Sequence, residues 1–197
     1  PLQALRAEWA RAAQHELRML FITGEAGIGK TRLAEELLLQ VHRQGHAAVR
    51  ARSYALEGRL PYGPLADWLR SLPLQAQFAK LDRVWLSELA RLLPEIRITR
   101  PELPEPELLP DRWQQKRLFE ALRQAFTSDF ANDGHTLLLL LDDLQWCDPE
   151  TLAWLQYLAE SAPQARLLVI GTVRNDEIQE DHPLRKLQRI LLRAGRL

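Results

Sequence analysis

The stretch from residue 19 to residue 45 constrains the fold more than any other part of the chain. A short apolar run, MLFIT (19–23), ends at a glycine, and after a glycine-rich turn apolar residues recur at helical spacing from Leu33 to Val41. The pattern predicts a buried strand, a tight loop and a helix. HAAVRARS (46–53) reads as a second strand, so the helix is predicted to be the crossover of a parallel βαβ unit.

The loop between the first strand and the helix, GEAGIGKT (24–31), matches the Walker A pattern G-x-x-x-x-G-K-[ST]. Its glycines allow the backbone to turn its N–H groups inward around phosphate oxygens, and the helix that follows adds the partial positive charge of its N-terminus. Lys30 is placed to bridge the β- and γ-phosphates, and the Thr31 hydroxyl to ligate Mg²⁺. The alternative is a glycine-rich turn with a lysine nearby that binds no phosphate. The residues predicted to bind nucleotide are Gly24, Glu25, Ala26, Gly27, Ile28, Gly29, Lys30, Thr31 and Arg32.

Two carboxylates follow a continuous leucine run in GHTLLLLLDD (134–143), which predicts a central parallel strand covered on both faces. The C-terminal ends of such strands are where open α/β sheets bind ligands. Asp142 is therefore predicted to hold Mg²⁺, directly or through a water, as the Walker B acid. Asp143 is predicted to reach the water near the γ-phosphate and act in hydrolysis. The alternative is that the two acids simply end the strand.

Three further residues lie near this edge of the predicted sheet. Arg174 ends the apolar run RLLVIGTVR (166–174), where a guanidinium can sense or stabilise a γ-phosphate, although an arginine at a strand end is more often solvated. Asp148 precedes Pro149 and is predicted to cap a helix rather than to act in catalysis. Trp146 is predicted to lie in the core under that helix, with a place beside the site as the alternative.

The rest of the chain predicts one unit with a helical insertion at about 54–111. Its 197 residues, 46 % of them hydrophobic, suffice for one substantial core. Within the insertion, helical pieces at 64–72 and 84–93 precede RITRPELPEPELLP (97–110), whose prolines predict an irregular loop. An opening helix is expected at 2–14, and further helices from about Arg112 to Phe130, at 149–161 and at 183–193.

Charge and cysteine content restrict the setting of the protein. The formal net charge is zero, with 26 basic and 26 acidic residues, so no overall field attracts nucleic acid or an anionic membrane. The single cysteine, Cys147, and the lack of an apolar signal region or an 18-residue apolar run favour a reducing, cytoplasmic location. The five histidines make no zinc-ligand spacing with Cys147, and no serine–histidine or cysteine–histidine pair indicates nucleophilic catalysis.

Taken together, GEAGIGKTRL, LLLLLDDLQWCD and VIGTVR make the chain resemble the nucleotide-binding domain of STAND proteins, signal-transduction ATPases close to the AAA+ class. ARSYALEGRLPYGPLADWLR resembles the segment that large ATP-binding bacterial transcriptional regulators of the LuxR and SARP types, and modules attached to cyclases, carry after the second strand. The resemblance implies an ATP- and Mg²⁺-dependent switch that slowly hydrolyses ATP and controls attached domains. The chain begins after the glycine–arginine pair usual in the family and ends without a helix-turn-helix, so we expect a fragment of a larger protein.

The fold expected is α/β: a three-layer P-loop NTPase sheet of the ASCE type with flanking helices, its P-loop strand central and one strand between it and the Asp142 strand. Residues 1–197 are expected to form a single nucleotide-binding domain that acts as a weak Mg²⁺-dependent ATPase. Expected partners are the nucleotide, further domains of the same polypeptide, such as a DNA-binding or cyclase domain, and a second copy in ATP-dependent self-association. The domain itself is not expected to bind nucleic acid or a membrane directly. Two alternatives remain: a DNA-handling AAA+ ATPase and a P-loop phosphotransferase. GTP is disfavoured because no N-K-x-D-type stretch is present.

Overall fold

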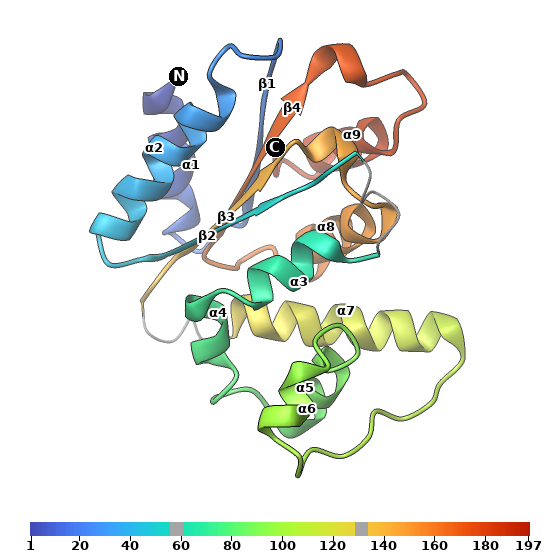
Figure 1. The fold of residues 1–197 in the computed structure, drawn as a ribbon. Helices are drawn as coiled ribbons and strands as arrows, with labels where there is room; N and C mark the ends of the chain where they lie inside the picture. The colour runs from blue at the N-terminus through green and yellow to red at the C-terminus, as the bar shows by residue number, and fades with distance from the viewer. Residues whose placement is uncertain (56–60, 129–133) are drawn as a thin grey trace.

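A four-stranded parallel sheet forms the centre of the computed structural model, which describes residues 1–55, 61–128 and 134–197 (Figure 1). Its strands are β1 (Arg18–Gly24), β2 (Ala47–Arg52), β3 (Leu137–Asp142) and β4 (Leu167–Arg174). They are arranged in the order β1-β4-β3-β2, and every neighbouring pair is parallel. One strand, β4, therefore separates the P-loop strand from the Asp142 strand, as expected. The expected central position of the P-loop strand was wrong, because β4 is the one strand of the described sheet that pairs with β1.

Helices cover both faces of the sheet, so the expected three-layer α/β architecture is confirmed (Figure 1). On one face lie α1 (Leu2–Ala12) and α2 (Lys30–Arg43), and on the other α3 (Gly63–Leu69), α8 (Pro149–Ser161) and α9 (Pro183–Arg193). The continuous leucine run of β3 fits a sheet that is covered on both faces, because successive side chains of a strand point to opposite faces. Leu138 and Leu140 belong to the core under α1 and α2, whereas Leu139 and Leu141 belong to the core of the other face.

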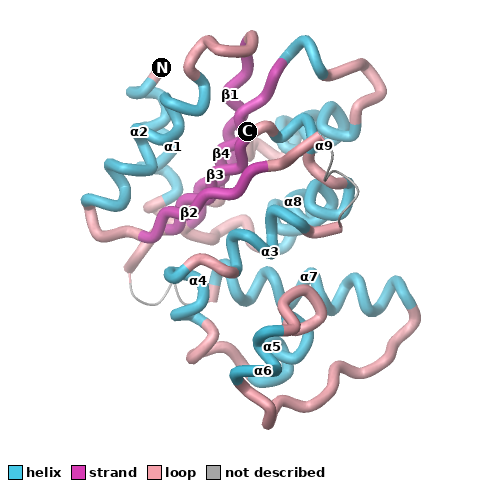
Figure 2. The backbone as a smooth tube through the Cα atoms, viewed as in Figure 1, coloured by secondary structure: helices cyan, strands magenta, loops and turns pink. Residues whose placement is uncertain are grey.

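The insertion between β2 and β3 is helical, as its sequence predicts, and extends below the sheet (Figure 2). After α3 it contains α4 (Leu72–Gln77), α5 (Arg83–Leu89) and α6 (Glu95–Thr99), followed by α7 (Asp111–Thr127). The short α4 and α6 were not predicted, and α6 takes up the first residues of the expected irregular loop. The predicted extension of α7 to Phe130 falls partly outside the described residues.

Two single-turn 3₁₀ helices follow the strands that carry the predicted acids and arginine. They are η1 (Leu144–Trp146), directly after β3, and η2 (Asn175–Glu177), directly after β4. Both lie at the carboxyl edge of the sheet and so shape the surroundings of the candidate site. Among the described residues, no helix combines the length and the apolar character needed to cross a lipid bilayer.

Candidate functional site

The loop between β1 and α2 has the backbone conformation that its glycines predict. Gly27 and Gly29 have φ angles of 79° and 95°, in a region that residues with a Cβ rarely adopt. No atom lies within 4 Å of a Cβ built at either position, so backbone conformation rather than crowding requires glycine there. Gly29 caps α2, whose first residue is Lys30. The loop thus leads directly into the N-terminus of α2, where backbone N–H groups favour the binding of an anion.

Lys30 spans the loop from which it emerges. Its Nζ donates hydrogen bonds to the carbonyl oxygens of Gly24 at 2.9 Å and Glu25 at 2.7 Å. The ammonium group is therefore held at the mouth of the loop by two neutral acceptors. A phosphate oxygen is a stronger acceptor for an ammonium donor than a peptide carbonyl, because that hydrogen bond is charge-assisted on both sides.

Asp142 lies at the centre of a polar cluster made by four elements. Its Oδ1 accepts hydrogen bonds from Thr31 Oγ1, at 2.8 Å, and from Thr172 Oγ1, while its Oδ2 accepts one from Arg50 Nη2 at 2.8 Å. Burial acts to raise the pKa of this carboxyl, but the hydrogen bonds from Thr172, Thr31 and Arg50 outweigh it, and the net pKa is lowered. The carboxylate is thus kept charged at the end of β3, next to the first turn of α2.

Asp143 follows in a left-handed conformation, with φ 55° and ψ 48°. Its Oδ2 accepts from Arg52 Nη2 at 2.9 Å, its Oδ1 lies 3.3 Å from Arg174 Nε, and its backbone N–H donates to Thr172 Oγ1 at 3.0 Å. Both carboxylate oxygens are therefore occupied by guanidinium groups. The structure brings Arg174 to the predicted edge of the sheet, where it also pairs with Glu177 at 3.0 Å.

Trp146 does not lie in the core, and this expectation was wrong. The ring is half-buried, and the guanidinium carbon of Arg174 lies 4.8 Å from its centroid, which places the ring beside the site as in the alternative. The predicted cap is confirmed: Asp148 Oδ1 accepts the backbone N–H of Thr151 at 2.8 Å at the start of α8.

A cavity of about 370 Å³ opens in front of these residues. It is lined by Gly27, Gly29, Lys30, Thr31, Arg32, Glu35, Arg52, Asp143, Thr172 and Arg174. Four cations and two carboxylates give this lining a net charge of +2 (4 − 2), which suits a polyanion. The other residues predicted to bind nucleotide, Gly24, Glu25, Ala26 and Ile28, belong to the same loop but do not line the cavity, and the Ile28 side chain is largely exposed.

Four residues of this site were not predicted from the sequence: Glu35, Arg50, Arg52 and Thr172. The arginines alternate along β2 and therefore share one face, a pattern that indicates an outward-facing polar side as readily as a site. Thr172 lies on β4, next to the strand that carries the acids. The sequence did contain an indication of this role: Thr172 lies near the end of a buried strand, two residues before Arg174.

The chain is similar to known proteins in its sequence family and in its fold. A family model described as AAA ATPase domain matches residues 1–170. The ORC2 protein of Aeropyrum pernix, solved as ADPNP-ADP complexes, is similar with a TM-score of 0.54 and 16 % identity, over 98 % of this chain and 43 % of that chain. Cdc6p of Pyrobaculum aerophilum is similar with a TM-score of 0.51 and 16 % identity, over 96 % and 42 %. No curated protein matched the chain.

At 16 % identity, the likeness to these two structures shows the fold alone. The chain spans about two fifths of the length of each of them, 43 % and 42 %. The fold is accordingly that of P-loop ATPases with a parallel sheet between helical layers.

Proposed function

Because the chain belongs to the family of AAA ATPase domains, we propose that the loop at 24–31 and the two acids after β3 form a site for ATP with Mg²⁺. The observation that carries this proposal is the hydrogen bond of 2.8 Å from Thr31 Oγ1 to Asp142 Oδ1. These residues stand 111 positions apart in the sequence and belong to different elements, yet their oxygens are in contact, and Thr31 lines the cavity. Both are hard oxygen donors, the ligand type that Mg²⁺ prefers.

The charges and shape of the cavity support a nucleoside triphosphate. The loop amides and the start of α2 are arranged for phosphate oxygens, and Lys30 already reaches across the loop, where a phosphate would replace the carbonyls of Gly24 and Glu25. Thr31 and Asp142 would hold the Mg²⁺, which when bound neutralises charge on the β- and γ-phosphates.

Asp143 and Arg174 are the proposed hydrolytic pair. Asp143 would orient the attacking water, and Arg174 would sense the γ-phosphate. In this structure the Asp143 carboxylate is held by Arg52 and Arg174, so it has to leave at least one guanidinium before it can accept a hydrogen bond from water. This arrangement supports slow turnover, as suits a switch better than a motor.

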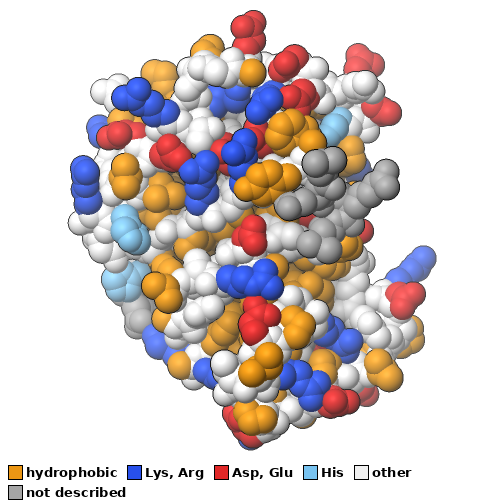
Figure 3. Space-filling model, viewed as in Figure 1, with side chains coloured by type: hydrophobic (Ala, Val, Ile, Leu, Met, Phe, Trp, Pro, Cys, Tyr) orange, Lys and Arg blue, Asp and Glu red, His pale blue; other side chains and the backbone are white. Residues whose placement is uncertain are grey.

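At the level of the whole protein, we propose a regulatory switch of the STAND type, in a transcriptional regulator or a related signalling protein. The segment that resembles those regulators forms the end of β2 and α3, and it carries Arg52 into the candidate site. Nucleotide occupancy can therefore bias the position of the insertion and of further domains of the same polypeptide. A DNA-handling role finds less support: Figure 3 shows basic and acidic side chains interspersed on one face, and the net charge is zero.

Isothermal titration calorimetry of MgATP tests the site. Wild-type protein is expected to bind, and Lys30→Ala to lose at least about tenfold in affinity, because one charge-assisted contact to phosphate is removed. Lys186→Ala, which removes an exposed lysine on α9, serves as the matched control and is expected to bind like wild type. Equal affinity of wild type and Lys30→Ala would refute the assignment. Titration with a duplex DNA probe under the same conditions tests the DNA-handling alternative.

A further inference from the structure

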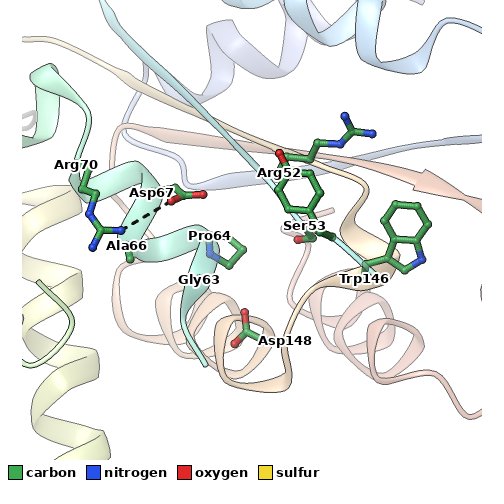
Figure 4. Close-up of a pocket in the computed structure, with 10 residues that line it drawn as sticks. Arg52, Ser53, Gly63, Pro64, Ala66, Asp67, Arg70, Trp146 and Asp148 are labelled. Atoms are coloured by element: carbon green, nitrogen blue, oxygen red, sulfur yellow. Dashed lines mark ion pairs between the residues drawn. The ribbon is translucent and has the colours of Figure 1, made fainter. Parts of the chain in front are cut away.

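A second cavity, of about 230 Å³, lies beside the candidate nucleotide site (Figure 4). It is lined by Arg52, Ser53, Tyr54, Gly63, Pro64, Ala66, Asp67, Arg70, Trp146 and Asp148. The end of β2, the helix α3 of the insertion and the segment around η1 each provide part of the wall. Arg52 lines both this cavity and the one in front of the phosphate loop. None of the functions proposed above uses this second cavity.

One wall carries a carboxylate that is weakly neutralised. Figure 4 shows Asp67 directed from α3 toward the end of β2. Its ion pair with Arg70 is long, at 4.0 Å, whereas Arg70 lies 2.8 Å from Glu95, which therefore competes for the same guanidinium. Partial burial raises the pKa of Asp67, and Arg70 offsets this only in part. A cationic donor in the cavity would supply the partner that Arg70 provides poorly.

A second carboxylate, that of Asp148, belongs to the lining of the cavity. Asp148 is 2 % exposed. Its Oδ1 accepts the backbone N–H groups of Tyr62 at 2.9 Å and Thr151 at 2.8 Å. Its Oδ2 is buried and, among the described residues, has no hydrogen-bond partner. This oxygen is closed off from solvent, so it adds negative charge to the wall of the cavity but is not itself open to a ligand.

A cation and several apolar groups also line the cavity. The Arg52 guanidinium pairs with Asp143 and lies 5.5 Å from the centroid of the Tyr54 ring. Pro64, Ala66 and the Trp146 ring contribute apolar surface. The lining thus combines a carboxylate for a cation, a guanidinium for an anion and apolar surface for a small side chain.

We propose that this cavity binds a free α-amino acid. The ammonium group would donate to the carboxylate of Asp67, with the charge of Asp148 in the same lining, and the carboxylate would accept from Arg52. The side chain would pack against Pro64 and Ala66. Binding in this way depends only on the second cavity and not on the ATPase function proposed above. Because Arg52 also holds Asp143, the occupant is linked to the nucleotide site, and this linkage does rest on the proposed function.

Calorimetric titration of the nucleotide-free chain with each of the twenty proteinogenic L-amino acids tests the site. At least one is expected to bind with one-to-one stoichiometry. Asp67→Asn keeps the shape of the side chain and is expected to weaken binding roughly tenfold or more, because the partner of the ammonium loses its charge. Glu160→Gln, which neutralises an exposed carboxylate on α8, is the control and should leave binding unchanged. The α-hydroxy acid that matches the bound amino acid should bind at least tenfold more weakly.

A second variant, Ala66→Phe, fills the cavity from α3 without altering any charged group and is also expected to abolish binding. The absence of binding by all twenty amino acids to wild type would overturn the proposal, as would binding that survives both Asp67→Asn and Ala66→Phe. A third titration, of MgATP with and without saturating amino acid, is expected to show at least a twofold change in affinity. An unchanged MgATP affinity would refute the linkage through Arg52. A failure of wild-type protein to bind MgATP at all would refute the proposed function and leave the amino acid site standing.

Discussion

Asp143 combines an uncommon backbone conformation with a carboxylate held on both sides. An aspartate tolerates the left-handed region better than most residues, and such conformations are frequent where function requires a side chain to be aimed. Here the turn directs the carboxylate between Arg52 and Arg174, at the wall of the cavity in front of the phosphate loop.

The replacement Asp143→Asn tests the proposed catalytic role. The amide keeps the size of the side chain but is a poor acceptor for a proton from water, so we expect ATP turnover to fall by roughly 10²-fold or more. MgATP affinity should change by less than about threefold, because the proposed role of Asp143 is to orient water and not to bind the nucleotide. A steady-state phosphate-release assay and calorimetry on the same preparation measure the two quantities. Unchanged turnover would remove Asp143 from the catalytic residues.

His46 is a residue whose protonation state matters for stability rather than for the site. Its Nδ1 accepts the backbone N–H of Thr136 at 3.2 Å, and its ring packs edge-on against Trp9 and His135. Burial lowers the pKa of His46, and the nearby His135 and Arg166 lower it further.

The depressed pKa of His46 predicts a loss of stability in mild acid. The folded state binds the proton less readily than the unfolded state, whose histidine has a pKa near 6.5, so the stability contribution is present above that pH and is lost as the pH falls below it. We expect the urea midpoint to fall between pH 7 and pH 5. His46→Asn keeps an acceptor near Nδ1 but does not titrate there, and should show a smaller decrease. An identical pH dependence in both proteins would contradict this account.

At the scale of elements, Glu88 joins α5 to α7 inside the insertion. Its side chain is 1 % exposed. It forms ion pairs of 2.9 Å with Arg91, three residues further along the chain, and with Arg117 of α7. A carboxylate buried this far is tolerated because two guanidinium groups surround it.

Removing the buried carboxylate of Glu88 is expected to destabilise the fold more than removing an exposed carboxylate nearby. Glu88→Ala leaves the Arg91 guanidinium without a carboxylate and removes the buried partner of Arg117, so the free energy of unfolding should fall by about 3 kcal/mol. Glu107→Ala removes an exposed carboxylate that also pairs with Arg117 at 3.0 Å, and should cost less than about 1 kcal/mol. Urea denaturation of the two variants compares them directly. Equal losses would show that burial does not distinguish the two pairs.

Periodicity in the sequence was sufficient for the long elements and insufficient for the short ones. The helices at 149–161 and 183–193 match their predicted bounds, because a capping residue, a proline and an apolar repeat coincide at each start. The short α4 and α6 contain too few residues for a repeat to show. Arg50 and Arg52 reach the acids because β2 pairs in parallel with β3, with Arg52 opposite Asp142. That register is a tertiary property which a strand's own sequence does not encode.

At the scale of the whole molecule, the insertion and the sheet share one hydrophobic core. Leu65, Trp68 and Leu86 of the insertion belong to the same buried cluster as Leu139 and Leu141 of β3. The order of the strands, like this shared core, depends on tertiary packing, and it was therefore predicted only in part. Local patterns indicate that strands are parallel and buried, but the neighbour of β1 is decided by how crossovers pack on the sheet.

This shared core predicts that the chain unfolds as one unit. Trp68 of α3 donates its indole N–H to the carbonyl oxygen of Leu140 at 3.2 Å, and its ring contacts Phe126 of α7, which in turn contacts Trp154 of α8. Loss of the insertion would therefore expose the sheet, and a separate early transition is not expected. Urea unfolding curves followed by far-ultraviolet circular dichroism and by tryptophan fluorescence should coincide. Trp68→Ala should move both curves together to lower urea concentration. The free energy of unfolding should fall by about 3–5 kcal/mol, because the substitution opens a cavity between the insertion and the sheet. Two separate transitions, with only the first shifted by the substitution, would show instead that the insertion is an independent module.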